Sequence, residues 1–125
     1  MIKCRTEISK EFRFESAHRL PFVPEGHKCG RIHGHSFTAR VTITGPVDEK
    51  LGWLMDYADL KQIVEPFIGM LDHNYLNDIK GLENPTSENL AMWLVHQIHP
   101  LLKGAKLKSV SVSETCESSC TVHVE

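Results

Sequence analysis

The chain has 125 residues, 41% of them hydrophobic and 24% charged, a balance typical of one folded domain rather than a disordered segment. A formal net charge of −2 gives no basic field of the kind that attracts nucleic acid. No apolar run approaches the roughly 18 residues that cross a bilayer. Residues 1–12 contain no apolar signal core, so we expect no membrane partner and a cytoplasmic protein with reduced cysteines.

Two segments in the first third of the chain alternate apolar and polar residues, which predicts half-buried antiparallel strands. They cover residues 11–20 and 33–45, and the loop at residues 21–31 between them contains two prolines and two glycines. Side chains point to opposite faces of a strand in turn, so Phe12 and Phe14 are expected on the buried side of the first strand.

Two helices are expected after a turn-rich connection. Asp56 is a candidate N-cap for the first helix, because its carboxylate can accept hydrogen bonds from first-turn N–H groups. Pro66 lacks a backbone donor and is expected to kink or interrupt this helix. The residues that recur at three- and four-residue steps and should form its buried stripe are Tyr57, Leu60, Val64, Phe67 and Leu71.

The second helix is expected to begin near Thr86 or Ser87, both favourable N-caps, and Pro100 and Gly104 mark its end. Its expected inward residues are Leu90, Trp93, Leu94, Ile98 and Leu101.

Residues 106–125 are typical of two short strands joined by a turn near residues 117–119. The order strand, strand, helix, helix, strand, strand predicts an α+β fold, a four-stranded antiparallel sheet with two helices packed on one face. The other face, rich in serine and threonine, is left to solvent or to another subunit.

Three histidines fall on the apolar faces of the first two predicted strands. His33 and His35 are two positions apart, so their side chains project to the same side about 7 Å apart, and His18 lies on the matching face of the other strand. Three imidazoles from two strands match an open zinc site, which keeps a fourth position for water or substrate. Alternatively, the segment is an ordinary strand entrance whose rings are satisfied by backbone carbonyls.

Cys29 precedes the histidine pair within the loop. The basic residues His27, Lys28 and Arg31, together with a nearby metal, would favour its thiolate, the reactive form. Cys29 is otherwise a free surface thiol, or a fourth zinc ligand that would make the site closed and structural. The spacing alone does not decide between ligand and catalyst.

Two carboxylates are candidate functional groups. Asp72 directly precedes His73, and a neighbouring carboxylate can orient an imidazole and raise its basicity, although adjacent Asp-His pairs also occur by chance. Glu114 lies on the apolar face of a predicted strand, where an unpaired carboxylate is costly. It either bends out to solvent or accepts two parallel hydrogen bonds from a planar pair of N–H groups, as on a guanidine-like ring edge.

The motifs FRFESAHRL, KCGRIHGHS, LDHNYLND, NPTSENLA and SETC follow one another in the order found in the 6-pyruvoyl tetrahydropterin synthase family. The chain resembles this family over nearly its whole length, residues 1–125 forming one domain of the tunnelling fold (T-fold). The spacing from Cys29 to His33 resembles that of the bacterial branch that acts in queuosine biosynthesis, the 6-carboxytetrahydropterin synthases. Another branch of the family uses a glutamate in place of the cysteine, and Cys29 sets this chain apart from it.

The resemblance implies a role for each candidate residue. Cys29 would be the general base, His73 its relay partner oriented by Asp72, and Glu114 the anchor of the pterin ring with Thr115 beside it. The implied zinc ligands are His18, His33 and His35. The basic residues that could hold a triphosphate are Arg19, His27, Lys28 and Arg31.

The reaction implied by the queuosine branch converts 7,8-dihydroneopterin triphosphate to 6-carboxy-5,6,7,8-tetrahydropterin, with release of acetaldehyde and triphosphate. The alternative within the family is a 6-pyruvoyl synthase, which eliminates triphosphate from the same substrate without carbon–carbon cleavage. A three-histidine zinc hydratase or hydrolase is a rival from another class, but it leaves Cys29 and Glu114 without a role. The second rival is a zinc-stabilised, non-enzymatic binding module.

The resemblance further implies a homo-oligomer, most simply a hexamer of two trimers. Cys29 of one chain would then face Asp72 and His73 of another. The polar second face of the sheet and its open strand edges agree with this expectation, because unpaired edges are a liability unless they are short, charged or paired.

Overall fold

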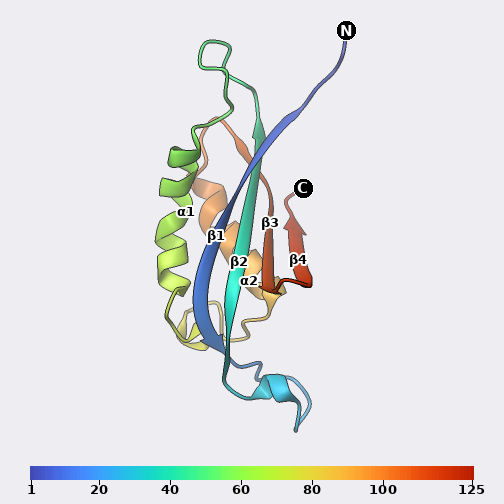
Figure 1. The fold of residues 1–125 in the computed structure, drawn as a ribbon, viewed down its shortest axis with the longest axis vertical. Coiled ribbons are helices and arrows are strands. Elements are labelled where there is room, and N and C mark those ends of the chain that lie inside the picture. Colours follow the sequence, from blue (N-terminus) through green and yellow to red (C-terminus); the bar gives the residue numbers. More distant parts are fainter.

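The computed structural model describes residues 1–125, and its main elements follow the expected order (Figure 1). The strands are β1 (Thr6–His18), β2 (His33–Gly45), β3 (Lys106–Thr115) and β4 (Ser118–His123). The helices are α1 (Tyr57–Leu71) and α2 (Ser87–Ile98), and single-turn 3₁₀ helices form η1 (Lys28–Gly30), η2 (Leu76–Asp78) and η3 (His99–Leu101). The predicted α+β architecture is therefore confirmed.

The sheet has the order β1-β2-β3-β4, with every neighbouring pair antiparallel. Both helices pack on one side of it, and in the view of Figure 1 α2 passes behind the strands while α1 lies to the left of β1. The pairing of β1 with β2 runs from Thr6 opposite Gly45 to His18 opposite His33. This register brings His18, the last residue of β1, beside His33, the first residue of β2.

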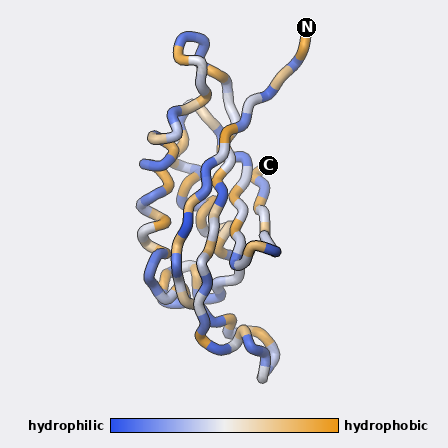
Figure 2. The backbone as a smooth tube through the Cα atoms, in the orientation of Figure 1, coloured by the Kyte–Doolittle hydropathy of each residue, from blue (hydrophilic) through white to orange (hydrophobic).

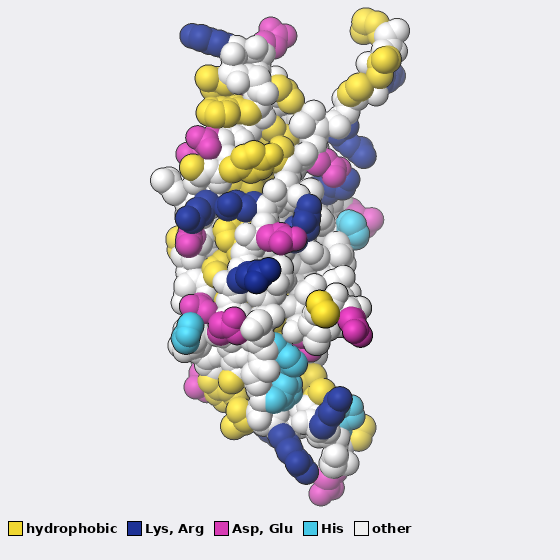
Figure 3. All heavy atoms as spheres, in the orientation of Figure 1, with side chains coloured by type: hydrophobic (Ala, Val, Ile, Leu, Met, Phe, Trp, Pro, Cys, Tyr) yellow, Lys and Arg dark blue, Asp and Glu magenta, His cyan; other side chains and the backbone are white.

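The apolar side of the alternation forms the core. Figure 2 shows hydrophobic and hydrophilic positions alternating along β1 and β2. The inward residues of β2 are completely buried: Phe37, Ala39, Val41 and Ile43. The outward side of both strands is polar, and Figure 3 shows charged side chains of both signs on this face. A carboxylate oxygen of Glu11 in β1 and a guanidinium nitrogen of Arg40 in β2 are 2.9 Å apart.

The first strand differs in its bounds from the predicted one. It begins at Thr6 rather than near Glu11, because pairing with the end of β2 extends a segment whose own apolar pattern is weak. It ends at His18, and the Leu20 N–H donates instead to the carbonyl of Cys29. The loop therefore starts earlier than the alternation suggests.

Helix α1 runs through Pro66 without a break, so the predicted interruption is wrong. Pro66 is exposed, which lets water reach the carbonyl that proline leaves without a donor. Both halves of the helix are held by residues buried against the sheet: Leu60, Val64, Ile68 and Leu71. The helical N-caps are confirmed, because the side chains of Asp56 and Thr86 accept hydrogen bonds from first-turn N–H groups.

Two residues expected to face inward are exposed, Tyr57 by 55% and Leu101 by 46%. Tyr57 lies in the first turn of α1, and Leu101 lies in η3. At both places the apolar periodicity of the sequence extends beyond the helical residues that pack against the sheet.

The turn between β3 and β4 lies at Cys116 and Glu117, slightly earlier than predicted. None of the helices combines the length and apolar character that a membrane span requires.

Candidate functional site

The two N-terminal strands gather His18, His33 and His35 at one end of the sheet. His18 is opposite His33 in the strand register, and His35 follows two positions along β2 on the same face. The ring centroids are 4.6 Å apart for His18 and His33, 5.2 Å for His18 and His35, and 4.9 Å for His33 and His35. One ring nitrogen of each lies within 4.8 Å of the others, so the three could hold one metal ion.

The hydrogen bonds of these rings orient free lone pairs towards a common point. Nδ1 of His18 lies 2.8 Å from the carbonyl oxygen of Pro85, and Nδ1 of His33 lies 2.7 Å from that of Arg31. A carbonyl only accepts, so each Nδ1 carries the proton and each Nε2 keeps its lone pair. Nε2 of His18 and of His35 is buried without any partner, an arrangement that is costly unless a ligand satisfies it.

The protonation state of His18 also suits a metal ligand. Burial is the largest influence and lowers the pKa of His18 below the ordinary 6.5, although the Pro85 carbonyl and the charge of Glu114 act in the opposite direction. The ring is therefore neutral at pH 7, as ligation requires. The alternative in which carbonyls satisfy these histidines accounts for Nδ1 of His18 and of His33, but it leaves the buried Nε2 atoms of His18 and His35 without a hydrogen-bond partner.

Glu114 lies beside the histidine cluster. Its Oε2 atom is 3.6 Å from Nε2 of His35, and 28% of its side chain is exposed. The carboxylate thus points along the rim of the cluster rather than out into solvent. The next residue, Thr115, uses its hydroxyl within the β3–β4 turn, where it lies 3.0 Å from the hydroxyl of Ser118.

Asp72 and His73 are fixed to the free edge of β1. Oδ1 of Asp72 accepts a hydrogen bond from the Glu15 N–H at 2.8 Å, and Oδ2 lies 2.8 Å from Nδ1 of His73. The His73 N–H in turn donates to the Glu15 carbonyl at 2.6 Å. His73 has a φ of 56°, a left-handed conformation that few residues other than glycine adopt. This strained geometry directs the ring while the backbone stays paired with β1.

The hydrogen bond between the two side chains shifts both pKa values. The Asp72 carboxylate raises the pKa of His73 above 6.5. The Glu15 N–H, and then His73, lower the pKa of Asp72 below 3.8. The contribution of His73 to stability is present below its unfolded pKa and is lost as pH rises through its folded pKa. That of Asp72 is present above 3.8 and is lost as pH falls through its folded pKa, so the pair is strongest from about pH 4 to 6.5.

We expect Asp72→Asn to lower the pKa of His73 towards its ordinary value, because the neutral amide no longer favours the charged ring. The measurement is an NMR titration of the His73 ring protons. Asp78→Asn is the matched control, since it removes a nearby carboxylate that makes no bond to His73. A His73 titration unchanged by Asp72→Asn would contradict the pairing.

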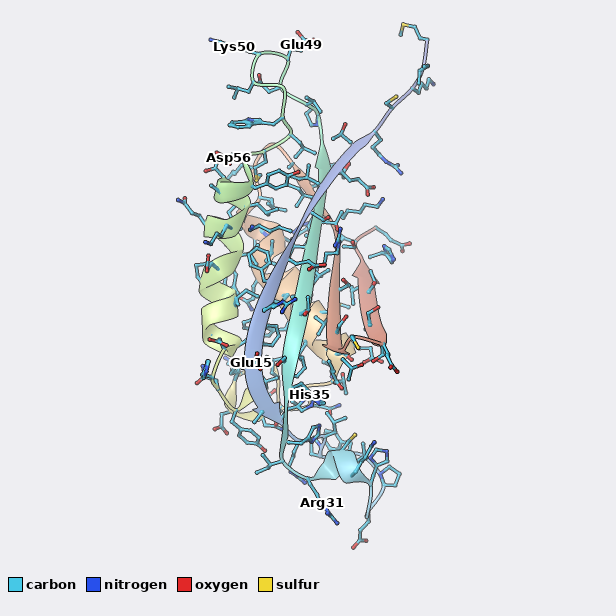
Figure 4. The ribbon with its side chains drawn as sticks, viewed as in Figure 1. Glu15, Arg31, His35, Glu49, Lys50 and Asp56 are labelled. Carbon is cyan, nitrogen blue, oxygen red and sulfur yellow. The ribbon has the colours of Figure 1, made fainter.

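One hollow lies between His73 and the strands β1 and β2, and His35 is the one member of the histidine cluster in its lining. It has a volume of about 560 Å³, and its lining includes Glu15, His35, Ser36 and His73. Figure 4 shows Glu15 and His35 on the neighbouring strands β1 and β2. The Glu15 carboxylate is held by the Ser36 hydroxyl, which donates to it at 2.6 Å.

Cys29 lies apart from this hollow, in η1, where it is half-buried. Its N–H donates to Nδ1 of His27 at 3.0 Å and its carbonyl accepts from Leu20 at 2.8 Å, but none of its hydrogen bonds reaches Asp72 or His73. No cysteine belongs to the cluster of possible metal ligands, which argues against a closed structural site.

The predicted triphosphate contacts are only partly gathered. Arg19, His27 and Arg31 line one hollow in the 19–31 loop, and Lys28 does not. Arg31 is labelled in Figure 4 near the end of that loop. His27 accepts a hydrogen bond at Nδ1, so in this loop conformation that ring nitrogen carries no proton.

Some residues of the site could not be found from sequence reasoning. Pro85 and Arg31 contribute only backbone carbonyls, which any residue carries. Glu15 and Asn77 also escaped notice, because their contacts join segments more than 50 residues apart in the chain. The only local hint of a role for Asn77 is its place in the polar segment that follows His73. The structure shows Asn77 half-buried there, in the 3₁₀ helix η2.

The comparisons with known proteins agree with one another. A model of the 6-pyruvoyl tetrahydropterin synthase family matches residues 7–125. A Synechocystis protein named 6-carboxy-5,6,7,8-tetrahydropterin synthase is 45% identical over 118 residues, covering 90% of this chain and 88% of that protein. A Pyrococcus furiosus protein named dihydroneopterin monophosphate aldolase is 36% identical over 102 residues, covering 81% of this chain and 82% of that protein.

A solved structure supports the fold independently. The 6-pyruvoyl tetrahydropterin synthase of Caenorhabditis elegans superposes with a TM-score of 0.88, covers 98% of this chain and 97% of that chain, and is 24% identical in sequence. The T-fold expected from the motifs is thereby confirmed for the single chain.

Proposed function

The chain belongs to the 6-pyruvoyl tetrahydropterin synthase family, and from this membership we propose that it is a carbon–carbon lyase of the queuosine pathway. Its substrate is 7,8-dihydroneopterin triphosphate and its products are 6-carboxy-5,6,7,8-tetrahydropterin, acetaldehyde and triphosphate. Residues 1–125 form one catalytic domain, which acts in the cytoplasm. The observation that carries the proposal is the convergence of three imidazoles with free Nε2 atoms beside Glu114.

The histidine cluster is proposed as the zinc site, with Nε2 atoms as ligands. Bound zinc would act as a Lewis acid for hydroxyl oxygens of the substrate side chain and stabilise the negative charge that develops on them. Three nitrogen ligands with an open fourth position fit this role. The carbonyls of Pro85 and Arg31 support it, because they fix the orientation of two of the rings.

The remaining residues bind the substrate and move protons. Cys29 takes a proton from a side-chain carbon, and His73, held by Asp72, transfers a proton at a neighbouring position. Glu114 accepts two N–H groups of the pterin ring, with Thr115 beside it. The residues proposed to surround the triphosphate are Arg19, His27, Lys28 and Arg31, which supply local positive charge in a chain whose net charge is negative.

Replacing Glu114 with glutamine should weaken pterin binding and leave the metal in place. One of the two acceptor oxygens becomes an NH₂ donor, and losing a charge-assisted hydrogen bond costs about 2 kcal/mol, or roughly 30-fold in affinity. Calorimetric titration with a non-reacting pterin measures the change, with Glu117→Gln in the exposed turn as control. An affinity equal to that of the unaltered protein would remove Glu114 from the pterin site.

We propose that the active form is a homo-oligomer, most simply a hexamer. In one chain Cys29 and the Asp72–His73 pair lie in separate segments without a hydrogen bond between them. The Asp72–His73 pair that works with Cys29 is therefore proposed to come from a second copy of the chain. The outer edges of β1 and β4 are also open over most of their length.

Mixing the two inactive proteins Cys29→Ala and His73→Ala should restore part of the activity once subunits exchange. Each mixed interface then combines an intact Cys29 with an intact His73. Sedimentation establishes the assembly, and exchange is followed with a fluorescent label on one partner. Absence of rescue despite proven exchange would mean that each chain contains a complete site.

Product analysis distinguishes the branches of the family. After incubation with 7,8-dihydroneopterin triphosphate, mass spectrometry should detect 6-carboxy-5,6,7,8-tetrahydropterin together with acetaldehyde. Triphosphate release without acetaldehyde would instead assign the 6-pyruvoyl reaction. Carbon–carbon cleavage without the 6-carboxy product would point to the aldolase seen in the Pyrococcus relative.

A further inference from the structure

Asn77 makes a two-sided contact with the backbone directly after the metal-site strand. Its Oδ1 atom accepts from the Arg19 N–H at 3.0 Å, and its Nδ2 atom donates to the Arg19 carbonyl at 2.7 Å. A side-chain amide that satisfies both backbone groups of one residue replaces the strand partner that the residue lacks. Asn77 is half-buried in η2 and follows the Asp72–His73 segment.

Arg19 carries this contact onward to the loop that contains Cys29. Its Nε–H donates to the Gly30 carbonyl at 2.9 Å, and the adjacent Leu20 N–H donates to the Cys29 carbonyl at 2.8 Å. Two consecutive carbonyls of η1 are therefore bound to two consecutive residues that follow His18. The other end of the loop is tied to the cluster as well, because the Arg31 carbonyl lies 2.7 Å from Nδ1 of His33.

We propose that Asn77 and Arg19 form a brace that sets the position of Cys29 relative to the three histidines. In this brace Arg19 acts through the geometry of its Nε–H, a role separate from the positive charge that it is proposed to offer the triphosphate. Both are positioning residues. Their effect on turnover rests on the proposed function, whereas their effect on the Cys29 thiol does not.

The brace has a physical purpose if Cys29 must meet a carbon-bound proton. Proton removal from carbon requires the base to lie within a narrow range of distance and direction, and a displacement near 1 Å can lower a rate by about a hundredfold. A loop with two prolines and two glycines holds no such position by itself. The side-chain bonds from Asn77 and Arg19 supply the missing constraint.

Three variants separate geometry from charge. Arg19→Lys keeps the positive charge but loses the fixed Nε–H, Arg19→Gln loses both, and Asn77→Asp keeps the Oδ1 acceptor but loses the Nδ2 donor. Arg5→Lys is the matched control, because Arg5 is exposed, directly precedes β1 at the end far from His18 in the strand, and makes no side-chain hydrogen bond. Zinc content and the thermal midpoint show whether each variant retains the site and the fold.

The decisive measurement is the rate at which iodoacetamide alkylates Cys29, followed by peptide mass spectrometry in zinc-loaded protein without substrate. We expect all three variants to change that rate several-fold, while alkylation of the exposed Cys4 stays constant. In Arg19→Lys and Asn77→Asp turnover should fall by roughly ten- to hundredfold with little change in KM. Arg19→Gln should lose at least as much turnover and in addition raise KM, because it also removes a charge proposed for the triphosphate.

Two results would overturn the brace. Either Cys29 alkylation is the same in all variants as in the unaltered protein, or Arg19→Lys behaves normally while Arg19→Gln raises KM, as expected of an anion contact. If Asn77→Asp fails to fold, the two Arg19 variants decide, because the Arg19 side chain is exposed. Failure of the unaltered protein to turn over the pterin would count against the proposed function alone, since the alkylation rates would still test the brace.

Discussion

Replacing Cys29 with alanine should lower turnover by about 10²- to 10⁴-fold, the usual contribution of a positioned general base. Zinc content should remain that of the unaltered protein, because no cysteine belongs to the cluster of possible ligands. Elemental analysis and a steady-state assay on the same preparation measure both quantities. The combination of full metal and lost activity is specific to a thiol that acts on substrate.

Cys116→Ala is the matched control, since it removes another thiol, exposed in the β3–β4 turn. It should leave metal and turnover unchanged. If Cys29→Ala loses its zinc as readily as a histidine variant, Cys29 is a fourth ligand and the structural-site rival gains. A normal rate would exclude Cys29 from the mechanism.

Replacing His33 with alanine should remove most of the zinc and the activity together. One of three nitrogen ligands is lost, and no other histidine or cysteine belongs to the cluster. The fold should survive, because His33 is the first residue of β2 and the buried residues of that strand begin at Phe37. Circular dichroism and elemental analysis provide the measurements.

His123→Ala supplies the control for a lost imidazole, since His123 is exposed at the end of β4 and outside the cluster. Full zinc occupancy in His33→Ala would contradict the three-histidine assignment. Loss of secondary structure in His33→Ala, but not in His123→Ala, would favour the non-enzymatic module that needs the metal to fold.

The strand alternation made the core of this site predictable. With a side-chain period of two, His18, His33 and His35 could only share the buried face once the neighbouring phenylalanines were placed there. Antiparallel pairing of adjacent strands then brought the three rings together. The element order was recoverable for the same reason, because each element has a strong period or a recognisable cap.

Features that depend on tertiary contacts were not predictable. The passage of α1 through Pro66 is decided by residues buried on either side of it, which outweigh the local cost of proline. The support of the histidines by the Pro85 and Arg31 carbonyls involves backbone atoms that carry no sequence signal. Asn77 and Arg19 meet across 58 positions of the chain, so no local pattern joins them.

The position of Cys29 relative to His73 in the active protein could not be predicted from the strand pattern. The resemblance implies that Cys29 of one chain faces Asp72 and His73 of another, and within one chain no hydrogen bond joins Cys29 to either residue. The proposed site shared between copies would be a property of an assembly, which no strand pattern within one chain encodes.

The zinc ion proposed for the three histidines should be needed for pterin chemistry and not for folding. Metal-free protein should keep its circular dichroism spectrum, form no 6-carboxy-5,6,7,8-tetrahydropterin from 7,8-dihydroneopterin triphosphate, and recover activity when one equivalent of zinc per chain is added. Unfolding on removal of the metal, or undiminished product formation by the metal-free protein, would contradict a catalytic role for zinc at the three histidines.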